Sequence, residues 1–300
     1  FGPRFSIPPE KLARFFVTVE NGYRSTLPYH NAVHAADVLH AVSRLASLQS
    51  VARFATDLDL LALYFAAIVH DLDHGGVNNT FLVNSSDPKA LLYNDRSVLE
   101  NHHVATAFAI LQQDKCNFLS HMNRTDYASF RELVIDLVLA TDLTQHFSVV
   151  SSFKNKVSVA ASYNPESVRE DSALCWKMIM KCGDVSNPSK EWSLRYVGPD
   201  IADTGVTNTK TARKADSRRA KFLNQGDREQ ELHLKVSPFM DRHSFNLTAN
   251  QIGFIDFICV STVIKRSPFR ESLPHPSVSE RAGGPENLTL ELVSRPFWPT

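Results

Sequence analysis

Two adjacent residues near position 70, and two others far from them in the sequence, have side chains that bind divalent metal ions. His70 and Asp71 follow a long apolar segment, and an imidazole and a carboxylate can both turn toward one ion where a helix ends. His34 and Asp184 supply the same donor types from two other segments. Helical bundles build metal sites where separate helices converge. These four residues therefore predict a metal site.

Each of these residues also has an ordinary structural explanation when taken alone. An adjacent His-Asp pair can occur by chance in a chain with 12 histidines, as a polar cluster that ends a helix. Asp184 alone is typical of a helix-ending turn. His30, however, lies four residues before His34, and the two imidazoles share one face if that segment is helical. It is the combination that favours a metal site.

The apolar pattern predicts that these residues stand at the ends of helices. Apolar positions recur every three to four residues in helices expected over 9–21, 36–48, 97–111, 130–142, 171–182 and 248–260. Segment 57–69 is apolar on nearly all sides and should be buried. Ser97 and Glu100 have the spacing of a capping box. The expected fold class is all-α, a compact multi-helix bundle.

Composition limits the partners and the location of the chain. Its 300 residues are 43% hydrophobic, and 32 basic side chains balance 32 acidic ones, so no long-range field favours nucleic acid. The four cysteines lack C-x-x-C spacing, which fits a reducing, cytoplasmic compartment. The longest strongly apolar stretch, residues 60–69, is half the length of a transmembrane segment.

Two stretches interrupt the helical pattern. Residues 197–215 are rich in Gly, Thr, Lys and Asp without periodicity, which is typical of a solvated insertion loop. Residues 267–300 are rich in Pro, Ser and Gly, which is typical of an irregular tail. We therefore expect a single domain over residues 1–266. Because the first residue is Phe, we interpret the chain as a piece of a longer polypeptide, with regulatory domains absent from it.

Six sequence blocks resemble the catalytic domain of the class I 3′,5′-cyclic nucleotide phosphodiesterases, in the family's order. The blocks are YHNAVHAADV (29–38), HDLDHGGVNNTF (70–81), ALLYNDRSVLENHH (90–103), DLVLATDLTQHF (136–147), KCGDVSNPSK (181–190) and NQIGFIDFI (250–258). The resemblance covers the chain from about residue 28 to 260. It implies an HD-type catalytic domain, an all-helical bundle with a deep pocket over two metals.

The resemblance implies a role for each candidate metal residue. The tight ion, usually Zn2+, would be held by His34, His70, Asp71 and Asp184. Asp71 would also bridge to a second ion, usually Mg2+ or Mn2+, whose other ligands are mostly waters. The side chains that match positions steadying those waters are His74, Glu100, Thr141 and Asp142. Taken alone, Glu100 and Thr141 would be a helix cap and a back-bonded hydroxyl.

The implied reaction is hydrolysis of the 3′ phosphoester bond of a cyclic nucleotide, cAMP, cGMP or both, to the nucleoside 5′-monophosphate. Two cations close together would acidify a bridging water to hydroxide and neutralise the charge that develops on the phosphate. His30 would be the general acid that protonates the leaving 3′-oxygen, since an imidazole pKa of about 6.5 permits donation near neutral pH.

A glutamine and an aromatic ring in the sixth block imply the substrate pocket. Gln251 and Phe254 are three residues apart, so the ring can stack on a base while the amide contacts the edge of that base. Without the family, Phe254 would be a core residue and Gln251 a solvent-facing one. Asn187 and Tyr29 complete the expected substrate-binding set. Because the Gln251 amide can rotate to serve adenine or guanine, the sequence does not choose between cAMP and cGMP.

The segment before Gln225-Gly226-Asp227 departs from the family pattern. Family members usually have an aliphatic residue where this chain has Arg218, and a glutamate that orients the general acid where it has Lys221. A cation at that place would lower the pKa of His30. Either an insertion shifts the register, or the segment is altered, or Asp216 substitutes for the glutamate.

Two other function classes remain open on the sequence. A binding module with this fold would retain metal and nucleotide but turn over poorly because of the changes at residues 218–221. A different HD-type hydrolase, acting on nucleoside triphosphates or cyclic dinucleotides, is disfavoured by the LENHH block and by the pairing of Gln251 with Phe254. The oligomeric state is not predicted.

Overall fold

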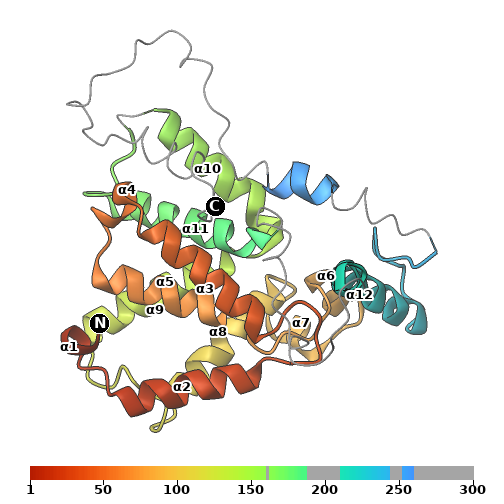
Figure 1. The fold of residues 1–300 in the computed structure, drawn as a ribbon, viewed down its shortest axis with the longest axis horizontal. Coiled ribbons are helices and arrows are strands. Elements are labelled where there is room, and N and C mark those ends of the chain that lie inside the picture. Colours follow the sequence, from red (N-terminus) through yellow and green to blue (C-terminus); the bar gives the residue numbers. More distant parts are fainter. Residues whose placement is uncertain (160–161, 188–209, 244–251, 260–300) are drawn as a thin grey trace.

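The structure, a computed structural model, describes residues 1–159, 162–187, 210–243 and 252–259, with the backbone alone over 210–220 (Figure 1). Within these ranges the regular structure is helical and no strand occurs, so the all-α fold class is confirmed. The elements are α1 (Gly2–Phe5), α2 (Pro9–Gly22), α3 (Ala32–Ala46), α4 (Gln49–Ala52), α5 (Asp57–Val69), α6 (Asn79–Asn84), α7 (Pro88–Leu92), α8 (Val98–Leu111), α9 (Arg124–Leu139), η1 (Leu143–Gln145), α10 (His146–Ser158), α11 (Arg169–Asp184), α12 (Lys210–Glu231) and the π-helical turn η5 (Ile255–Cys259).

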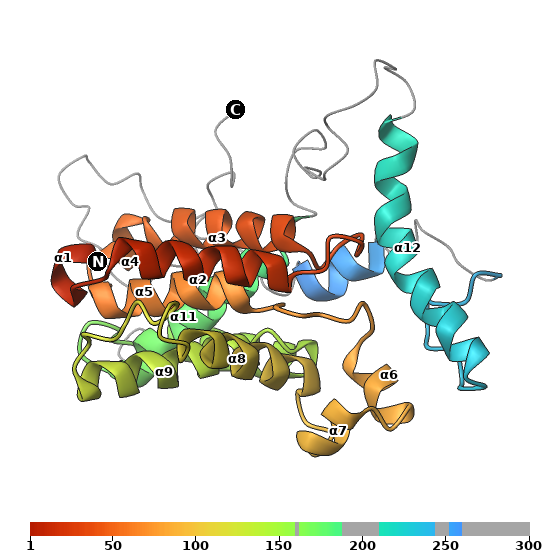
Figure 2. The same ribbon diagram turned by 90° about the horizontal axis from the view of Figure 1, so that it is seen from below.

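Helix α5 forms the centre of the bundle, packed between α3 and α9 (Figure 2). Phe65 in α5 packs against Phe15 of α2, with ring centroids 5.2 Å apart, and against Phe130 of α9 at 5.3 Å. Replacing one such ring by alanine typically costs about 3–5 kcal/mol. The end of α5 is therefore a rigid place from which to project functional side chains.

The ends of α5 agree with the sequence prediction of residues 57–69. Its first turn is closed by a capping box, in which the Asp59 N–H donates to Thr56 Oγ1 and the Thr56 N–H donates to Asp59 Oδ2, each at 3.1 Å. The helix ends at Val69, and His70 is its C-cap. The adjacent His70 and Asp71 therefore lie where the helix stops, as the sequence predicts.

The capping box predicted at Ser97 and Glu100 is wrong. Ser97 precedes α8 with a left-handed φ of 42°, and its hydroxyl donates to Asp142 Oδ2 at 2.7 Å instead of to the helix. The Glu100 carboxylate accepts a bond from Asn79 Nδ2 at 2.9 Å. Both side chains are thus drawn toward tertiary partners, which the local spacing could not reveal.

Gly183 does not end its helix, although the sequence favours an end there. It lies inside α11, and a Cβ at this position would come within 2.6 Å of the Val42 side chain in α3. The glycine therefore allows α3 and α11 to approach closely. This extension of α11 makes Asp184 its last residue.

Part of the predicted insertion loop is helical. Residues 210–215 belong to α12, which starts at Lys210, whereas residues 197–209 lie outside the described residues. Lys, Ala and Arg have high helix propensity, so this stretch can be helical without an apolar periodicity. The expected tail at 267–300 also lies outside the described residues.

Helix α12 stands at one end of the bundle, steeply inclined to α3 and α5 (Figure 2). Its buried Gln225 exchanges hydrogen bonds with Asn78 next to α6: Asn78 N donates to Gln225 Oε1 at 2.9 Å, and Gln225 Nε2 donates to Asn78 Oδ1 at 3.0 Å. A Cβ at Gly226 would come within 1.9 Å of the Met240 carbonyl oxygen. These contacts fix α12 beside the loop that follows His70 and Asp71.

Among the described residues no single helix is long and apolar enough to cross a membrane. Helix α9 together with the following segment, η1 and α10, reaches that length and apolarity, but the two parts are bent by 86° relative to each other.

Candidate metal centre

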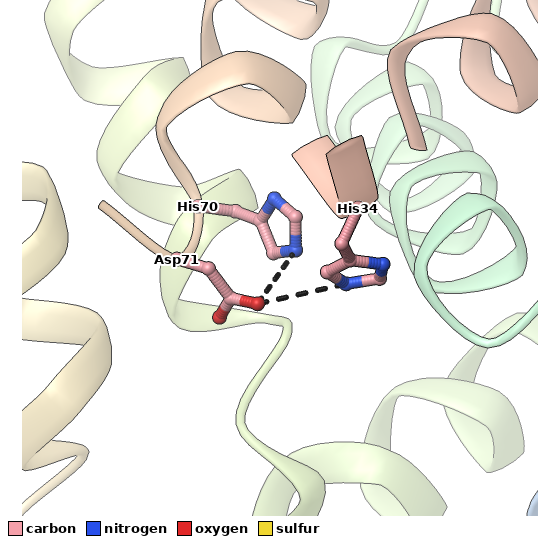
Figure 3. Close-up of side chains that lie close together, drawn as sticks. All are labelled: His34, His70 and Asp71. Carbon is pink, nitrogen blue, oxygen red and sulfur yellow. Dashed lines mark ion pairs between the residues drawn. The ribbon is translucent and has the colours of Figure 1, made fainter. Parts of the chain in front are cut away.

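The ends of three helices bring the four predicted ligands together, and Figure 3 shows three of them, His34, His70 and Asp71. His34 lies in the first turn of α3, where the Asn31 side chain caps the helix by accepting the N–H bonds of Val33 and His34. His70 and Asp71 follow α5, and Asp184 ends α11. Helices α5 and α11 both pack against α3, which is why these ends meet.

Four donor atoms face one another across a small gap. His34 Nε2 lies 3.2 Å from Asp184 Oδ1 and 3.5 Å from Asp71 Oδ2. His70 Nε2 lies 3.4 Å from Asp71 Oδ2 and 3.5 Å from Asp184 Oδ1. Two ligands on a tetrahedral zinc ion, with bonds of about 2.0–2.1 Å, are separated by about 3.3 Å. The spacing therefore fits one ion held by all four residues.

The His70 ring shows that a positive charge is needed in this gap. Its Nδ1 must donate to the Ala67 carbonyl oxygen 3.0 Å away, which leaves the lone pair on Nε2 in the neutral ring. His70 Nε2 is buried and has no hydrogen-bond partner, yet it faces the carboxylates of Asp71 and Asp184. A lone pair and two anions repel one another unless a proton or a metal cation lies between them.

The pKa values follow from this arrangement. Burial by itself would lower the pKa of His70, but the negative charges of Asp71 and Asp184 outweigh it and raise that pKa to about 9. Burial would raise the pKa of Asp184, but the His34 and His70 rings that face it hold it well below its usual range. A proton on His70 thus takes the place that a metal would fill.

The second oxygen of Asp71 faces a different pair of histidines. Asp71, His74 and His103 form a group whose possible ligand atoms lie within 4.8 Å of one another. His103 Nδ1 donates to the Leu72 carbonyl oxygen at 2.5 Å, so the lone pair of Nε2 points toward Asp71 Oδ1, 3.9 Å away. One oxygen of Asp71 therefore faces His34 and His70, and the other faces the second pair of histidines, as a bridging ligand requires.

His74 has the opposite tautomer. Its Nδ1 accepts the Gly76 N–H at 2.9 Å, so the neutral ring carries its proton on Nε2 and can donate to a water. Burial lowers the pKa of His74 to about 3 and that of His103 to about 4, despite the opposing charge of Asp71. Both rings are therefore neutral near pH 7.

Glu100 lies within electrostatic reach of both Asp71 and Asp142, and Thr141 directly precedes Asp142. Burial, together with the charges of Asp142 and Asp71, raises the pKa of Glu100 to about 7 against the opposing Asn79 bond. Thr141 Oγ1 donates to the Val138 carbonyl oxygen at 2.7 Å, which is the back-bonded arrangement. Asp142 accepts bonds from Ser97 and from the Thr144 N–H.

The buried Lys181 of α11 holds the chain just before Thr141 and Asp142 against that helix. Its Nζ donates to the Ala140 carbonyl oxygen at 2.6 Å, one residue before Thr141. The carbonyl groups at the C-terminus of α9 carry partial negative charge, which stabilises a cation there. The lysine thereby ties the end of α9 to the helix that presents Asp184.

His30 lies beside the centre but does not share a helix with His34. Asn31 is the N-cap of α3, so the expected helical spacing of the two histidines is wrong. The two rings nevertheless have centroids 6.3 Å apart, and the His30 ring lies 3.7 Å from that of His74. The loop before the cap, rather than a helical face, brings His30 to the metal residues.

Lys221 of α12 contacts His30 directly. Its Nζ lies 2.9 Å from His30 Nε2 and 4.8 Å from the centroid of the Tyr29 ring. Burial and the charges of His74 and Lys221 lower the pKa of His30 well below its ordinary value. At neutral pH the His30 ring is therefore uncharged and accepts a hydrogen bond at Nε2.

A comparison with known protein families decides the identity of the chain. The family model for 3′,5′-cyclic nucleotide phosphodiesterases matches residues 29–198 and 199–273, which include every metal residue described above. The chain belongs to the 3′,5′-cyclic nucleotide phosphodiesterase family.

Curated phosphodiesterases are similar to most of this chain. A probable 3′,5′-cyclic phosphodiesterase of Caenorhabditis elegans is 37% identical over 280 residues, 93% of the chain and 39% of the relative. The 3′,5′-cyclic-AMP phosphodiesterase 4C of Rattus norvegicus is 36% identical over 264 residues, 85% of the chain and 45% of the relative. The chain thus spans less than half the length of these relatives.

Solved phosphodiesterase structures share the fold. The phosphodiesterase domain of the RhoPDE fusion protein from Salpingoeca rosetta superposes with a TM-score of 0.75 at 31% identity, covering 87% of this chain and 77% of that one. A second crystal structure of the domain gives a TM-score of 0.76 at 30% identity, covering 87% and 74%.

The expected substrate-binding residues of this phosphodiesterase family member are only partly described. Tyr29 lies against the centre, with its ring centroid 4.6 Å from that of His34. Asn187, just after α11, and Phe254, before η5, are half-buried. Gln251 lies outside the described residues. The base pocket expected at Gln251 and Phe254 therefore stays a prediction, as does a deep pocket over two metals.

His103 is the site residue that the sequence reasoning missed. The signal was present, because His103 closes the LENHH block in which Glu100 was chosen. Only the fold shows that its Nδ1 is held by the Leu72 carbonyl oxygen, leaving Nε2 toward Asp71.

Proposed function

We propose that this chain hydrolyses the 3′ phosphoester bond of a cyclic nucleotide, cAMP, cGMP or both, to the nucleoside 5′-monophosphate. The observation that carries this proposal is the convergence of donor atoms from His34, His70, Asp71 and Asp184 at separations of 3.2–3.5 Å. The substrate class is supported by relatives named as cyclic-AMP phosphodiesterase and as dual specificity cyclic nucleotide phosphodiesterase.

We propose Zn2+ at the first site and Mg2+ or Mn2+ at the second. Two imidazoles and two carboxylates at His34, His70, Asp71 and Asp184 form a donor set suited to zinc. The second site offers one oxygen of Asp71 and a His74 ring that can donate to a water, and such a site suits a hard ion that keeps its waters. When bound, the ions would lower the pKa of coordinated water and offset the charge that develops on the phosphate.

Proton delivery to the leaving 3′-oxygen falls to His30 and Lys221 together. An ammonium group only donates, so His30 accepts at Nε2 and carries its own proton on Nδ1. As the bond between phosphorus and the 3′-oxygen breaks, that oxygen takes the Nδ1 proton while Nε2 takes one from Lys221. Lys221 then recovers a proton from water. The relay avoids an imidazolium, which burial beside Lys221 disfavours.

The same contact favours one alternative function. If the lowered pKa of His30 prevents proton delivery, the chain is a binding module that holds metal and nucleotide but turns over poorly. The two functions differ in rate rather than in binding. They are therefore separated by measuring both quantities on one preparation.

The deciding experiment compares cAMP and cGMP hydrolysis side by side, using the purified chain loaded with Zn2+ and Mg2+. We expect the matching 5′-monophosphate in chromatography with at least one substrate, and none with Asp184→Ala. Calorimetry on the same preparation measures nucleotide binding. Nucleotide binding without any 5′-monophosphate would support the binding module instead.

We also propose that residues 1–266 form one catalytic domain that acts in the cytoplasm. All four cysteines are free in the structure, as a reducing compartment favours. The chain would take a small-molecule cyclic nucleotide rather than a nucleic acid, because its 32 basic and 32 acidic side chains balance.

A further inference from the structure

The turn that carries Asp71 and His74 contains a residue with an unusual backbone. Asp73 has a left-handed φ of 57°, a conformation that Gly adopts most readily and that Asp or Asn tolerates. The His74 N–H closes the turn by donating to the Asp71 carbonyl oxygen at 3.1 Å. The conformation of Asp73 therefore sets the directions of Asp71 and His74, although Asp73 itself belongs to neither group of candidate metal ligands.

Two donors from different parts of the chain hold the Asp73 carboxylate, one at each oxygen. His102 Nε2, on α8, donates to Asp73 Oδ2 at 2.8 Å. Arg24 Nη2, just after the end of α2, donates to Asp73 Oδ1 at 3.0 Å. Because a carboxylate only accepts, the His102 ring carries a proton on Nε2. The carboxylate cannot rotate without losing one of these bonds, so it is fixed between α8 and the end of α2.

The residue before Asp73 is held from the same two sides. Leu72 is buried, and its carbonyl oxygen accepts the bond from Nδ1 of His103, the residue that follows His102 on α8. On the other side, a Cβ at Gly22, the last residue of α2, would come within 2.7 Å of Leu72 Cδ1. The end of α2 and helix α8 thus contact the turn at two successive residues.

The bonds of Asp73 explain why this position is an aspartate. A glycine would adopt the left-handed conformation with less strain, so the backbone alone does not require a carboxylate. Stability does not require one either, because the side chains of Arg24 and Asp73 are 50% and 35% exposed, and ion pairs with such exposure stabilise a fold little. What the carboxylate provides is a fixed orientation of the turn.

We propose that Asp73 is a positioning residue for the second metal site. Its carboxylate, held by both donors, keeps the turn in a conformation that directs Asp71 Oδ1 and His74 toward the second ion. This inference rests on the two-metal site of the proposed function. The first ion would also have ligands on α3 and α11, so the second should depend more strongly on Asp73. Partners that orient metal ligands in this way contribute about 10–100-fold to metal affinity.

The test measures Mn2+ binding to the zinc-loaded chain from the electron paramagnetic resonance signal of free Mn2+. Asp73→Gly favours the same backbone but removes the carboxylate, so it should raise the Kd for Mn2+ about tenfold or more while zinc per chain stays unchanged. Asp73→Asn keeps an acceptor oxygen and tolerates the left-handed backbone, so it should retain most of the affinity. Glu132→Gln breaks the exposed ion pair with Arg169 and, as the control, should leave the Kd within about twofold. Equal Mn2+ affinity in the original chain and in Asp73→Gly, or loss of zinc together with Mn2+, would overturn the proposal.

The kinetics separate positioning from a general structural role. Asp73→Gly leaves every proposed ligand and His30 in place, so kcat should return to near its original value at saturating Mn2+. A kcat that stays low there would contradict the positioning role. Failure of the proposed function has a different signature, in which the original chain binds Mn2+ but hydrolyses neither cAMP nor cGMP, and the Mn2+ affinities still decide the role of Asp73. An original chain that hydrolyses a cyclic nucleotide but binds no Mn2+ beside its zinc would refute the role of Asp73 alone.

Discussion

Lys221 Nζ lies 2.9 Å from His30 Nε2, at the place where the resemblance to the family implies a glutamate beside the proposed general acid. A carboxylate would favour the imidazolium, whereas an ammonium disfavours it and can only donate a proton. Proton delivery in the proposed reaction thus depends on a cation, Lys221, that the resemblance to the family does not imply.

Removing the Lys221 ammonium should slow the reaction. If Lys221 supplies the proton through His30, Lys221→Met lowers kcat by about 10²-fold, at the low end of what general acid catalysis contributes, with KM little changed. Lys221→Glu introduces the carboxylate that the resemblance implies and should keep substantial activity. That activity should fall as the pH rises through the pKa of His30, and because the carboxylate raises this pKa, the fall should come at higher pH than for an unassisted imidazole. Steady-state rates between pH 5 and 9 check both variants. A higher kcat in Lys221→Met would show instead that the lysine inhibits.

Removing one carboxylate of the metal centre should cost a metal as well as activity. Asp184→Asn keeps the shape but removes the anion that faces His34 and His70, so we expect zinc per chain to fall to near zero after dialysis. Elemental analysis gives the metal content independently of any assay. Asp227→Asn is the matched control, because that carboxylate pairs with Arg242 away from the centre. Full zinc content in Asp184→Asn would contradict its assignment as a ligand.

Most of the candidate metal cluster could be predicted from the sequence because its pattern is local. His70 and Asp71 could be placed at a helix end from the apolar run before them, and Asp184 from the end of the next such run. The role of His103 could not be found in this way, because it depends on a contact with the carbonyl of Leu72, far from it in the sequence.

The errors have a common physical cause. Ser97 and Glu100 match a local capping pattern, but their bonds go to Asp142 and Asn79, which only the tertiary fold brings close. A glycine such as Gly183 is typical of a helix end, yet it lies inside α11, where the absence of a side chain allows α3 to pack closely. Local patterns predict what a residue can do, whereas packing decides which partner it finds.

Loosening α12 should disturb the site from a distance. Gln225 joins this helix to Asn78, and removing a buried hydrogen-bonding group costs about 1–3 kcal/mol. Gln225→Ala should therefore lower the melting temperature, increase amide exchange in α12 and lower kcat by displacing Lys221. Gln230→Ala, an exposed neighbour on the same helix, is the control. Unchanged exchange in Gln225→Ala would contradict the role assigned to the Asn78 contact.

Acid should weaken the fold through Asp171, a buried carboxylate that is not among the candidate metal ligands. Asp171 is almost fully buried, and its oxygens accept bonds from the Asn164 N–H and from Lys156 Nζ, both at 2.8 Å. Burial alone would raise the pKa of Asp171, but these two donors outweigh it and hold the pKa below its ordinary value. The carboxylate is therefore more acidic in the folded chain than in the unfolded chain.

The sign of the pH dependence follows from this lowered pKa. Stability from Asp171 is fully present above the unfolded pKa of about 3.9, and it is lost as the pH falls through the lower folded value. Asp171→Asn should lower the free energy of unfolding by about 1–3 kcal/mol at pH 7, and by less as the pH falls below about 4. Urea denaturation of the original chain and of Asp171→Asn, at pH 7, pH 4 and about pH 3.5, measures the difference between their free energies of unfolding. Glu170→Gln, at the exposed neighbouring position, should show no such dependence, and a difference for Asp171→Asn that is the same at every pH would contradict the role of its charge.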